Sequence, residues 1–84
     1  MKKTKKKLNI KTLDLHGLNR FDAEFELQEF FNDLKEKNVD KCKIITGWGK
    51  EKEPVLFTFT KDWLQAKGYD FDNDLGSFFV YLND

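Results

Sequence analysis

Several residue types are scarce in this chain of 84 residues, and each scarcity excludes a class of protein. The single cysteine, Cys42, cannot form an internal disulfide, which fits a reducing compartment and predicts a cytoplasmic protein. One cysteine and one histidine, His16, are too few for a zinc site. The longest uncharged run, residues 75–83, is far shorter than the roughly 18 residues of a membrane-spanning helix. No apolar stretch follows the lysine-rich start, so neither a secretory leader nor a membrane partner is expected.

Acidic residues are missing from the first part of the chain. Residues 1–12 hold six lysines and no acid, whereas residues 13–84 hold nine basic and fifteen acidic side chains, so +6 is followed by −6. We expect residues 1–7 to form a mobile basic arm, either a solvated tail or a handle for a polyanion. Residues 8–84 are expected to form one small domain, with its many aromatic side chains supplying much of the core.

Strand-like and helix-like patterns alternate along the domain. Residues 8–15 predict a strand, and the helix that follows has Asn19 as a suitable N-cap and Asn38 as a suitable end. Phe21 and Phe25 lie four residues apart and are expected to pack as a local pair. An apolar stripe at helical spacing predicts the buried face of this helix: Ala23, Leu27, Phe30, Phe31 and Leu34.

The middle of the chain predicts a strand and a second helix. Residues 43–46 are β-branched and predict a buried strand, with Cys42 as a small filler beside it. Residues 54–67 also have strand-like propensity, but Pro54 suits a first helical position and Gly68 suits the position after a helix, which favours a helix. The expected apolar stripe of this helix is Leu56, Phe59, Trp63 and Leu64.

The last part of the chain predicts a hairpin. Residues 69–72 alternate apolar and acidic side chains as a charge-guarded edge strand does, and residues 73–76 form the turn. Residues 78–82 are apolar enough to predict a strand that is buried on both faces. The order β-α-β-α-β-β predicts a two-layer α/β sandwich in which strands 8–15 and 43–46 are parallel neighbours.

Asp14 and His16 are the first candidates for chemistry. Alternate residues of a strand share a face, so both side chains point the same way where the strand ends, and Gly17 allows a sharp turn after them. A carboxylate that orients a titratable imidazole is a common ingredient of acid–base chemistry. The alternative is structural, with His16 at a strand end and Asp14 accepting hydrogen bonds from turn amides.

A second motif, Thr46-Gly47-Trp48-Gly49, ends the second strand beside the first motif. The glycines are either a turn that needs positive φ or part of a nest of amides that accepts a phosphate, with Lys50 adding charge. Trp48 is either a cap on the core or an exposed platform on which a base stacks.

The two motifs together resemble those of the Smr (small MutS-related) domain family. Its first motif is L-D-x-H-G, here residues 13–17, and its second is T-G-x-G, here residues 46–49. The resemblance extends over residues 10–82. It implies the fold of the C-terminal domain of translation initiation factor 3, with a mixed sheet of order 1-2-4-3 and the fourth strand antiparallel.

The resemblance also implies an endonuclease that nicks or cleaves RNA or DNA. Asp14 and His16 correspond to its catalytic motif. The expected substrate-binding residues are the glycine loop and nearby basic side chains: Thr46, Gly47, Trp48, Gly49, Lys50 and Arg20. No cofactor is required, although Asp14 is able to ligate a divalent metal. The expected partner is a nucleic acid, with association with the ribosome as an extension.

Two other functions remain open at this point. A non-catalytic module of the same fold, docking on RNA, DNA or a ribonucleoprotein, is favoured by the acidic body and by the short glycine-rich segment before the last strand. A domain that binds only proteins is the third hypothesis.

Overall fold

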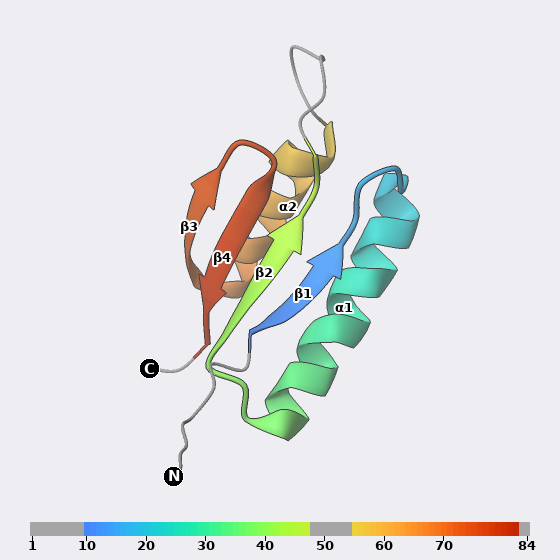
Figure 1. Cartoon of the computed structure of the whole chain (residues 1–84). Coiled ribbons are helices and arrows are strands. Elements are labelled where there is room, and N and C mark those ends of the chain that lie inside the picture. The colour runs from blue at the N-terminus through green and yellow to red at the C-terminus, as the bar shows by residue number, and fades with distance from the viewer. Residues whose placement is uncertain (1–9, 48–54, 83–84) are drawn as a thin grey trace, which may run out of the picture.

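The fold is described from a computed structural model over residues 10–47 and 55–82, and the predicted arm lies outside these ranges. The elements are β1 (Lys11–Asp14), α1 (Arg20–Lys37), β2 (Lys41–Ile45), α2 (Val55–Lys67), β3 (Asp70–Asp74) and β4 (Ser77–Tyr81). One sheet has the strand order β1-β2-β4-β3, with β1 and β2 parallel and β4 antiparallel to both of its neighbours (Figure 1). The predicted element order, α/β class and sheet order are confirmed.

Helix α1 begins and ends as the sequence predicts. The Asn19 side chain accepts a hydrogen bond from the Asp22 amide at 2.8 Å, and Asn38 adopts the left-handed conformation that closes the helix. Phe21 and Phe25 are 85% and 62% exposed, so the expected local pair does not cover either ring. Four members of the predicted stripe are buried and Phe30 is half-buried.

The segment of residues 54–67, which has both strand-like and helix-like signals, forms helix α2 as predicted. The buried face of this helix is rotated from the expected one. Phe57 and Thr60 are buried, whereas Leu56 and Phe59 are only partly covered. The reason is a tertiary contact, because the Phe57 ring stacks on Phe78 of β4 with 4.6 Å between ring centroids. Pro54 lies outside the described residues.

Strand β4 corrects one prediction. Phe78 and Val80 are fully buried, but Phe79 is only half-buried and Tyr81 is exposed, so the strand is buried on one face and not on both. Side chains alternate across a strand, and the helices cover only one face of the sheet. The hairpin turn is also shorter than predicted, because β3 extends to Asp74 and only Leu75 and Gly76 separate the two strands.

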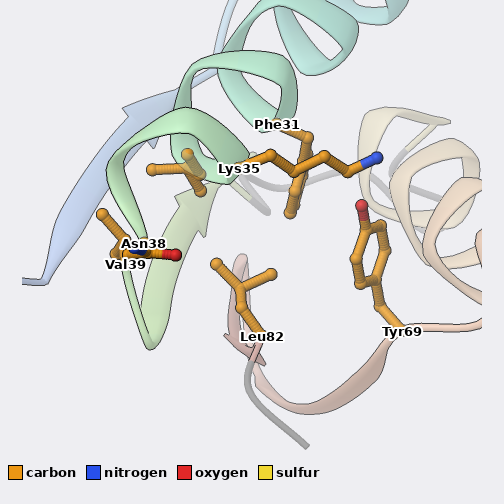
Figure 2. Close-up of a pocket in the computed structure, with 7 residues that line it drawn as sticks. Phe31, Lys35, Asn38, Val39, Tyr69 and Leu82 are labelled. Carbon is orange, nitrogen blue, oxygen red and sulfur yellow. The ribbon is translucent and has the colours of Figure 1, made fainter.

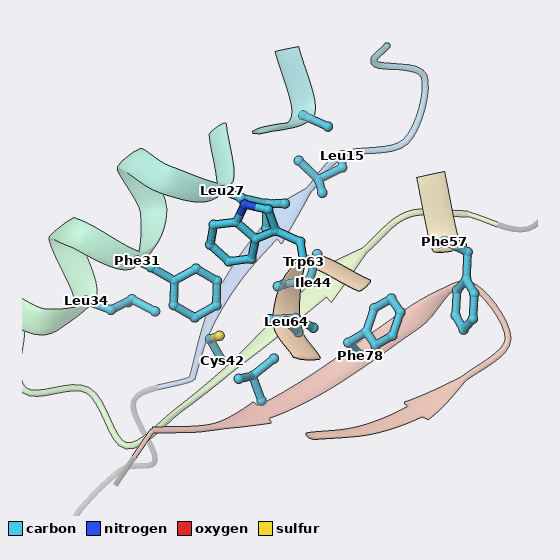
Figure 3. Packing of buried hydrophobic residues seen from close by; sticks show 12 residues of the cluster. Leu15, Leu27, Phe31, Leu34, Cys42, Ile44, Phe57, Trp63, Leu64 and Phe78 are labelled. Atoms are coloured by element: carbon cyan, nitrogen blue, oxygen red, sulfur yellow. The ribbon is translucent and has the colours of Figure 1, made fainter. Parts of the chain in front are cut away.

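The core lies between the helices and the covered face of the sheet (Figure 3). Cys42 is buried in β2, as predicted, and burial raises the pKa of its thiol to about 12. Leu15, directly after β1, is also fully buried. The helices within the described ranges are too short or too polar to cross a bilayer.

Candidate active site at the carboxyl ends of β1 and β2

The two candidate catalytic residues flank a buried leucine at the end of β1. Asp14 is the last residue of the strand, and Asp14 and His16 are exposed on either side of the fully buried Leu15. The Leu15 amide donates to the carbonyl of Ile45 at 2.7 Å, which continues the parallel pairing of β1 with β2. Burial of Leu15 therefore fixes the backbone that presents the carboxylate and the imidazole to solvent.

Asp14 holds His16 through two hydrogen bonds to one carboxylate oxygen. The imidazole Nδ1 lies 2.8 Å from Asp14 Oδ1, and the His16 backbone amide donates to the same oxygen at 3.1 Å. The structural and the chemical interpretations of Asp14 are therefore compatible. The carboxylate accepts a hydrogen bond from a turn amide and also orients the imidazole ring. These bonds, first the side-chain bond and then the backbone bond, lower the pKa of Asp14 from its ordinary value.

The ionised state of Asp14 decides which imidazole nitrogen is available. A carboxylate only accepts hydrogen bonds, so the proton between the two side chains belongs to Nδ1 of His16. In a neutral imidazole the lone pair then resides on Nε2, which is the atom that takes a proton from a nucleophile. Side-chain exposures of 70% for His16 and 51% for Asp14 leave the pair open to a large substrate.

Gly47 brings the end of β2 against His16. It has φ +79, a conformation that side-chain-bearing residues rarely adopt, and a Cβ built on it would lie 3.3 Å from the Cβ of His16. The two motifs, about thirty residues apart in sequence, therefore meet as the parallel strands predict. A glycine is required here for both its backbone conformation and its lack of a side chain.

The polar groups of Thr46 and Gly47 are bonded within the fold. Both amides donate to the carbonyl of Gly76, at 2.8 and 3.0 Å, and the buried Thr46 hydroxyl lies 3.3 Å from the Gly47 and Gly76 carbonyls. They tie β2 to the β3–β4 turn. Sequence reasoning missed Gly76, since its contribution is a backbone oxygen with no side-chain signal. Trp48, Gly49 and Lys50 lie outside the described residues.

Arg20 lies at the entrance of α1 and faces the second helix. It lines an open depression of about 250 Å³ with residues from the first turns of α2: Val55, Thr58, Phe59 and Asp62. The first turns of both helices lie at the same end of the molecule as the carboxyl ends of β1 and β2 (Figure 1). Helix N-termini carry partial positive charge.

Comparison with known proteins places this geometry in a family. The sequence model of the Smr domain matches residues 13–77, which include the first motif, both helices and most of the sheet. This chain belongs to the Smr domain family. The sequence matches no curated protein.

Two solved structures share the fold of this Smr domain. The Smr domain of Thermus thermophilus MutS2 is similar with a TM-score of 0.77 and 18% identity, covering 88% of this chain and 99% of that one. The solution structure of the B3BP Smr domain has a TM-score of 0.64 and 22% identity, covering 86% of this chain and 77% of that one. The family-model match includes the Asp14–His16 pair.

A second depression lies at the opposite end of this Smr domain (Figure 2). It measures about 240 Å³ and is lined by Phe31, Leu34, Lys35, Asn38, Val39, Tyr69 and Leu82. Tyr69 stacks on Phe31 with 4.7 Å between ring centroids, and burial is the main cause that raises the pKa of its phenol. The depression holds none of the predicted site residues and is smaller than most ligand pockets. We therefore place the candidate site at the Asp14–His16 end.

Metal ligands are sparse among residues 10–47 and 55–82, where no three His, Cys, Asp or Glu side chains cluster closely enough to hold an ion. Asp70, Asp72 and Asp74 do not form a binding loop, because they follow one another along the same face of β3.

Proposed function

We propose that this Smr domain is an endonuclease that cleaves phosphodiester bonds of RNA or DNA, with RNA preferred. One observation carries the proposal: the 2.8 Å contact between Asp14 Oδ1 and His16 Nδ1, in an exposed pair at the carboxyl ends of two parallel strands. Open α/β sheets commonly bind ligands outside these strand ends. The exposure of the pair suits a polymeric substrate better than a small molecule.

His16 acts as the general base in this mechanism. Its Nε2 removes a proton from the nucleophile, either water or a ribose 2′-hydroxyl, as the oxygen attacks phosphorus and the bond to the leaving oxygen breaks. The leaving oxygen then takes a proton from the imidazolium or from water. Asp14 keeps Nδ1 protonated and stabilises the positive charge that His16 acquires. Arg20 and the N-termini of both helices attract the phosphate.

The direct test compares wild type with His16→Ala on single-stranded RNA, structured RNA and nicked plasmid. Loss of a general base typically costs about 10²–10⁴ in rate, so cleavage by the variant should fall by at least two orders of magnitude. Gln28→Ala, at an exposed position of α1, is the matched control and should cleave as wild type does. Equal cleavage by wild type and His16→Ala would sink the assignment.

Asp14→Asn separates orientation from charge. The amide oxygen of Asn accepts a hydrogen bond from Nδ1, but a neutral side chain stabilises the imidazolium less and also permits the other tautomer. We expect slower cleavage with the affinity for substrate preserved. Loss of binding in this variant would instead assign Asp14 to substrate contact.

The basic arm should supply attraction that does not depend on sequence. Residues 1–7 hold five lysines. Each lysine that contacts a phosphate of single-stranded nucleic acid makes the slope of log affinity against log salt concentration more negative by about 0.7. Deleting residues 1–7 should flatten the slope, while cleavage at saturating substrate survives because Asp14 and His16 remain. An unchanged slope would assign the contacts to the domain itself.

A non-catalytic nucleic-acid or ribonucleoprotein module is the second candidate. It is favoured by the charge of −6 over residues 13–84 and by the short glycine-rich segment before the last strand. The ribosome is one such partner in the cytoplasm. This candidate predicts binding without turnover and no change on His16→Ala, so the cleavage assay decides between the two.

A further inference from the structure

The face of the sheet that the helices leave uncovered carries an ordered set of side chains. In β2 the buried Cys42 and Ile44 alternate with partly exposed Lys41, Lys43 and Ile45. Beside them, β4 places Phe79 and Tyr81 on the same face, opposite its own buried residues. Strand β3 adds a column of exposed aspartates. Three neighbouring strands therefore present lysine, aromatic and aspartate columns in that order.

The strand register makes two complete rows across these columns. In the first row Lys43 lies opposite Phe79, which lies opposite Asp72, and the Lys43 amine is 5.3 Å from the ring centroid. The second row holds Lys41, Tyr81 and Asp70, with 5.5 Å from the Lys41 amine to the ring. 

One contact connects the two rows. The Tyr81 hydroxyl donates to Asp72 at 2.8 Å, which fixes the ring on the sheet. Within the described ranges, Lys41 and Lys43 form no ion pair with a carboxylate, and each amine instead lies over a ring, so a base that stacks on that ring displaces the amine towards the phosphate of the same nucleotide.

We propose that this open face binds two successive nucleotides of a single-stranded nucleic acid, with phosphates on the lysines, bases on the rings and base amino groups on the aspartates. A nucleotide has the same lateral order: an anionic backbone, a flat ring and a hydrogen-bonding edge. Neighbouring strands are about 4.8 Å apart, so the three columns span roughly 10 Å. Aromatic side chains stack on bases of any sequence, and carboxylates accept hydrogen bonds from amino groups such as that of cytosine.

The spacing between the two rings of β4 favours a nucleic-acid strand whose bases are not stacked on one another. Phe79 and Tyr81 are two residues apart, or about 7 Å at the usual rise of a strand. Stacked bases follow one another at 3.4 Å, so the two rings fit bases that have been separated, as in single-stranded segments bound by proteins. The acidic column repels phosphates and confines the backbone to the β2 side.

The two rows of lysine, ring and aspartate, here called the platform, lead to the candidate active site. This part of the inference rests on the proposed function. Asp14 lies opposite Ile45 on the same uncovered face, one row beyond Lys43 and Phe79. Ile10 precedes β1 at the end of the sheet where Lys41 and Tyr81 lie. A nucleic-acid strand that follows β2 towards its carboxyl end therefore runs from Lys41 to the Asp14–His16 pair, which places the bound nucleotides next to the scissile bond.

The test measures binding separately from cleavage. The His16→Ala protein is titrated with hexamers of cytidine and of uridine, as RNA and as DNA, at low salt while backbone amides are followed by NMR. We expect shifts at Lys41, Lys43, Phe79 and Tyr81, with tighter binding of the cytidine hexamer because uracil lacks an exocyclic amino group. Comparison of the RNA hexamers with the DNA hexamers shows whether the ribose 2′-hydroxyl contributes to binding.

Matched variants identify the contacts. Phe79→Leu keeps an apolar side chain but removes the ring, and stacking energies predict about 5–150-fold weaker binding. Phe21→Leu is its control, since that ring is exposed on the acidic helix α1, and it should bind unchanged. Lys43→Gln should weaken binding and reduce the salt slope by about 0.7, whereas Lys61→Gln on α2 should not.

Asp70→Asn tests the proposed hydrogen bond between an aspartate and the amino group of a base. An amide donates as well as accepts, so the preference for cytidine over uridine should weaken in this variant, with Asp72 still reading the other base, while the affinity for uridine is maintained. Equal binding by Phe79→Leu and Phe21→Leu would overturn the platform. Shifts on this face that depend on protein concentration without oligonucleotide would also overturn it and assign the face to a second copy of the chain.

The outcomes separate this inference from the proposed function. Binding on the open face by a protein that never cleaves would remove the endonuclease and keep the platform. Cleavage that is lost in His16→Ala but unaffected by Phe79→Leu and Lys43→Gln would keep the endonuclease and remove the platform.

Discussion

The two faces of the sheet are built from the same strands and serve different purposes. On the covered face, Phe78 and Val80 of β4 are completely buried among the helices. On the open face, Phe79 and Tyr81 of the same strand lie beside lysines at cation–π distance. Because side chains alternate at every residue, one short strand contributes to stability with one set and presents the other on the face that we propose to bind nucleic acid. A single domain of 84 residues thereby offers a surface without sacrificing its core.

The strongest test of this contrast replaces neighbouring phenylalanines. Phe78→Ala should destabilise the domain by about 3–5 kcal/mol, as large core truncations do. Domains of this length have about 4–12 kcal/mol of stability, so a large part would be lost. Phe79→Ala should cost about 1 kcal/mol because its ring is already half-exposed. Urea denaturation measures both, and equal losses would mean that the second face is also covered in solution.

A smaller effect is expected at Gly47, which follows β2 at the candidate active site. Gly47→Ala should cost about 1–3 kcal/mol because alanine is strained at φ +79 and its Cβ meets His16. Gly68→Ala, after α2, is a matched control, with φ +81 and, its chain neighbours aside, no atom within 4 Å of the new Cβ. Both variants share the backbone strain, so the difference in unfolding free energy isolates the contact with His16. Only Gly47→Ala should shift the imidazole resonances, and an identical response from both would contradict the close approach.

Two buried threonines should respond in opposite directions. Thr46→Val removes a hydroxyl that donates to the β3–β4 turn and should destabilise the domain by about 1 kcal/mol. The buried Thr60 hydroxyl has no hydrogen-bond partner among the described residues, so Thr60→Val should be neutral or stabilising by up to about 1 kcal/mol. Thermal unfolding compares the two proteins. Destabilisation by Thr60→Val would reveal a partner for its hydroxyl.

The smallest effect concerns the charge of Asp14 on the open face. The pKa of Asp14 is lowered below its ordinary value of 3.8, mainly by the His16 side chain. Its contribution to stability is therefore complete above pH 3.8 and is lost as pH falls through the lower, folded-state value. In His16→Ala the pKa should rise towards 3.8 without reaching it, because the backbone amide of residue 16 still donates. An NMR titration of the carboxyl carbon that gives the same midpoint in both proteins would show that the side-chain contact is absent.

Local signals predicted the parts of the structure that depend on neighbours in sequence. The Asn19 cap, the left-handed Asn38 and the alternation of Asp14 and His16 about Leu15 follow from rules that act over a few residues. The parallel pairing of β1 and β2 was also predictable, since strand, helix and strand in this order favour it. These rules together were sufficient to predict the candidate catalytic pair.

Contacts between distant segments account for what local signals missed. The buried face of α2 depends on Phe57 meeting Phe78 across about twenty residues, which helical periodicity does not contain. Similarly, the Gly76 carbonyl is an acceptor for Thr46 and Gly47 only because β4 lies next to β2. An apolar strand at the end of the chain suggested burial on two faces, because sequence does not show which face the helices cover.

The sequence by itself determined the family, the element order and the residues of the Asp14–His16 pair, because motifs and periodicity are local properties of the chain. Only the tertiary structure decided that the Gly76 carbonyl accepts from Thr46 and Gly47 and that the uncovered face places lysines, rings and aspartates in adjacent columns. The physical reason is strand order. β4 inserts between β2 and β3, and this long-range pairing brings together side chains that lie about thirty to forty residues apart.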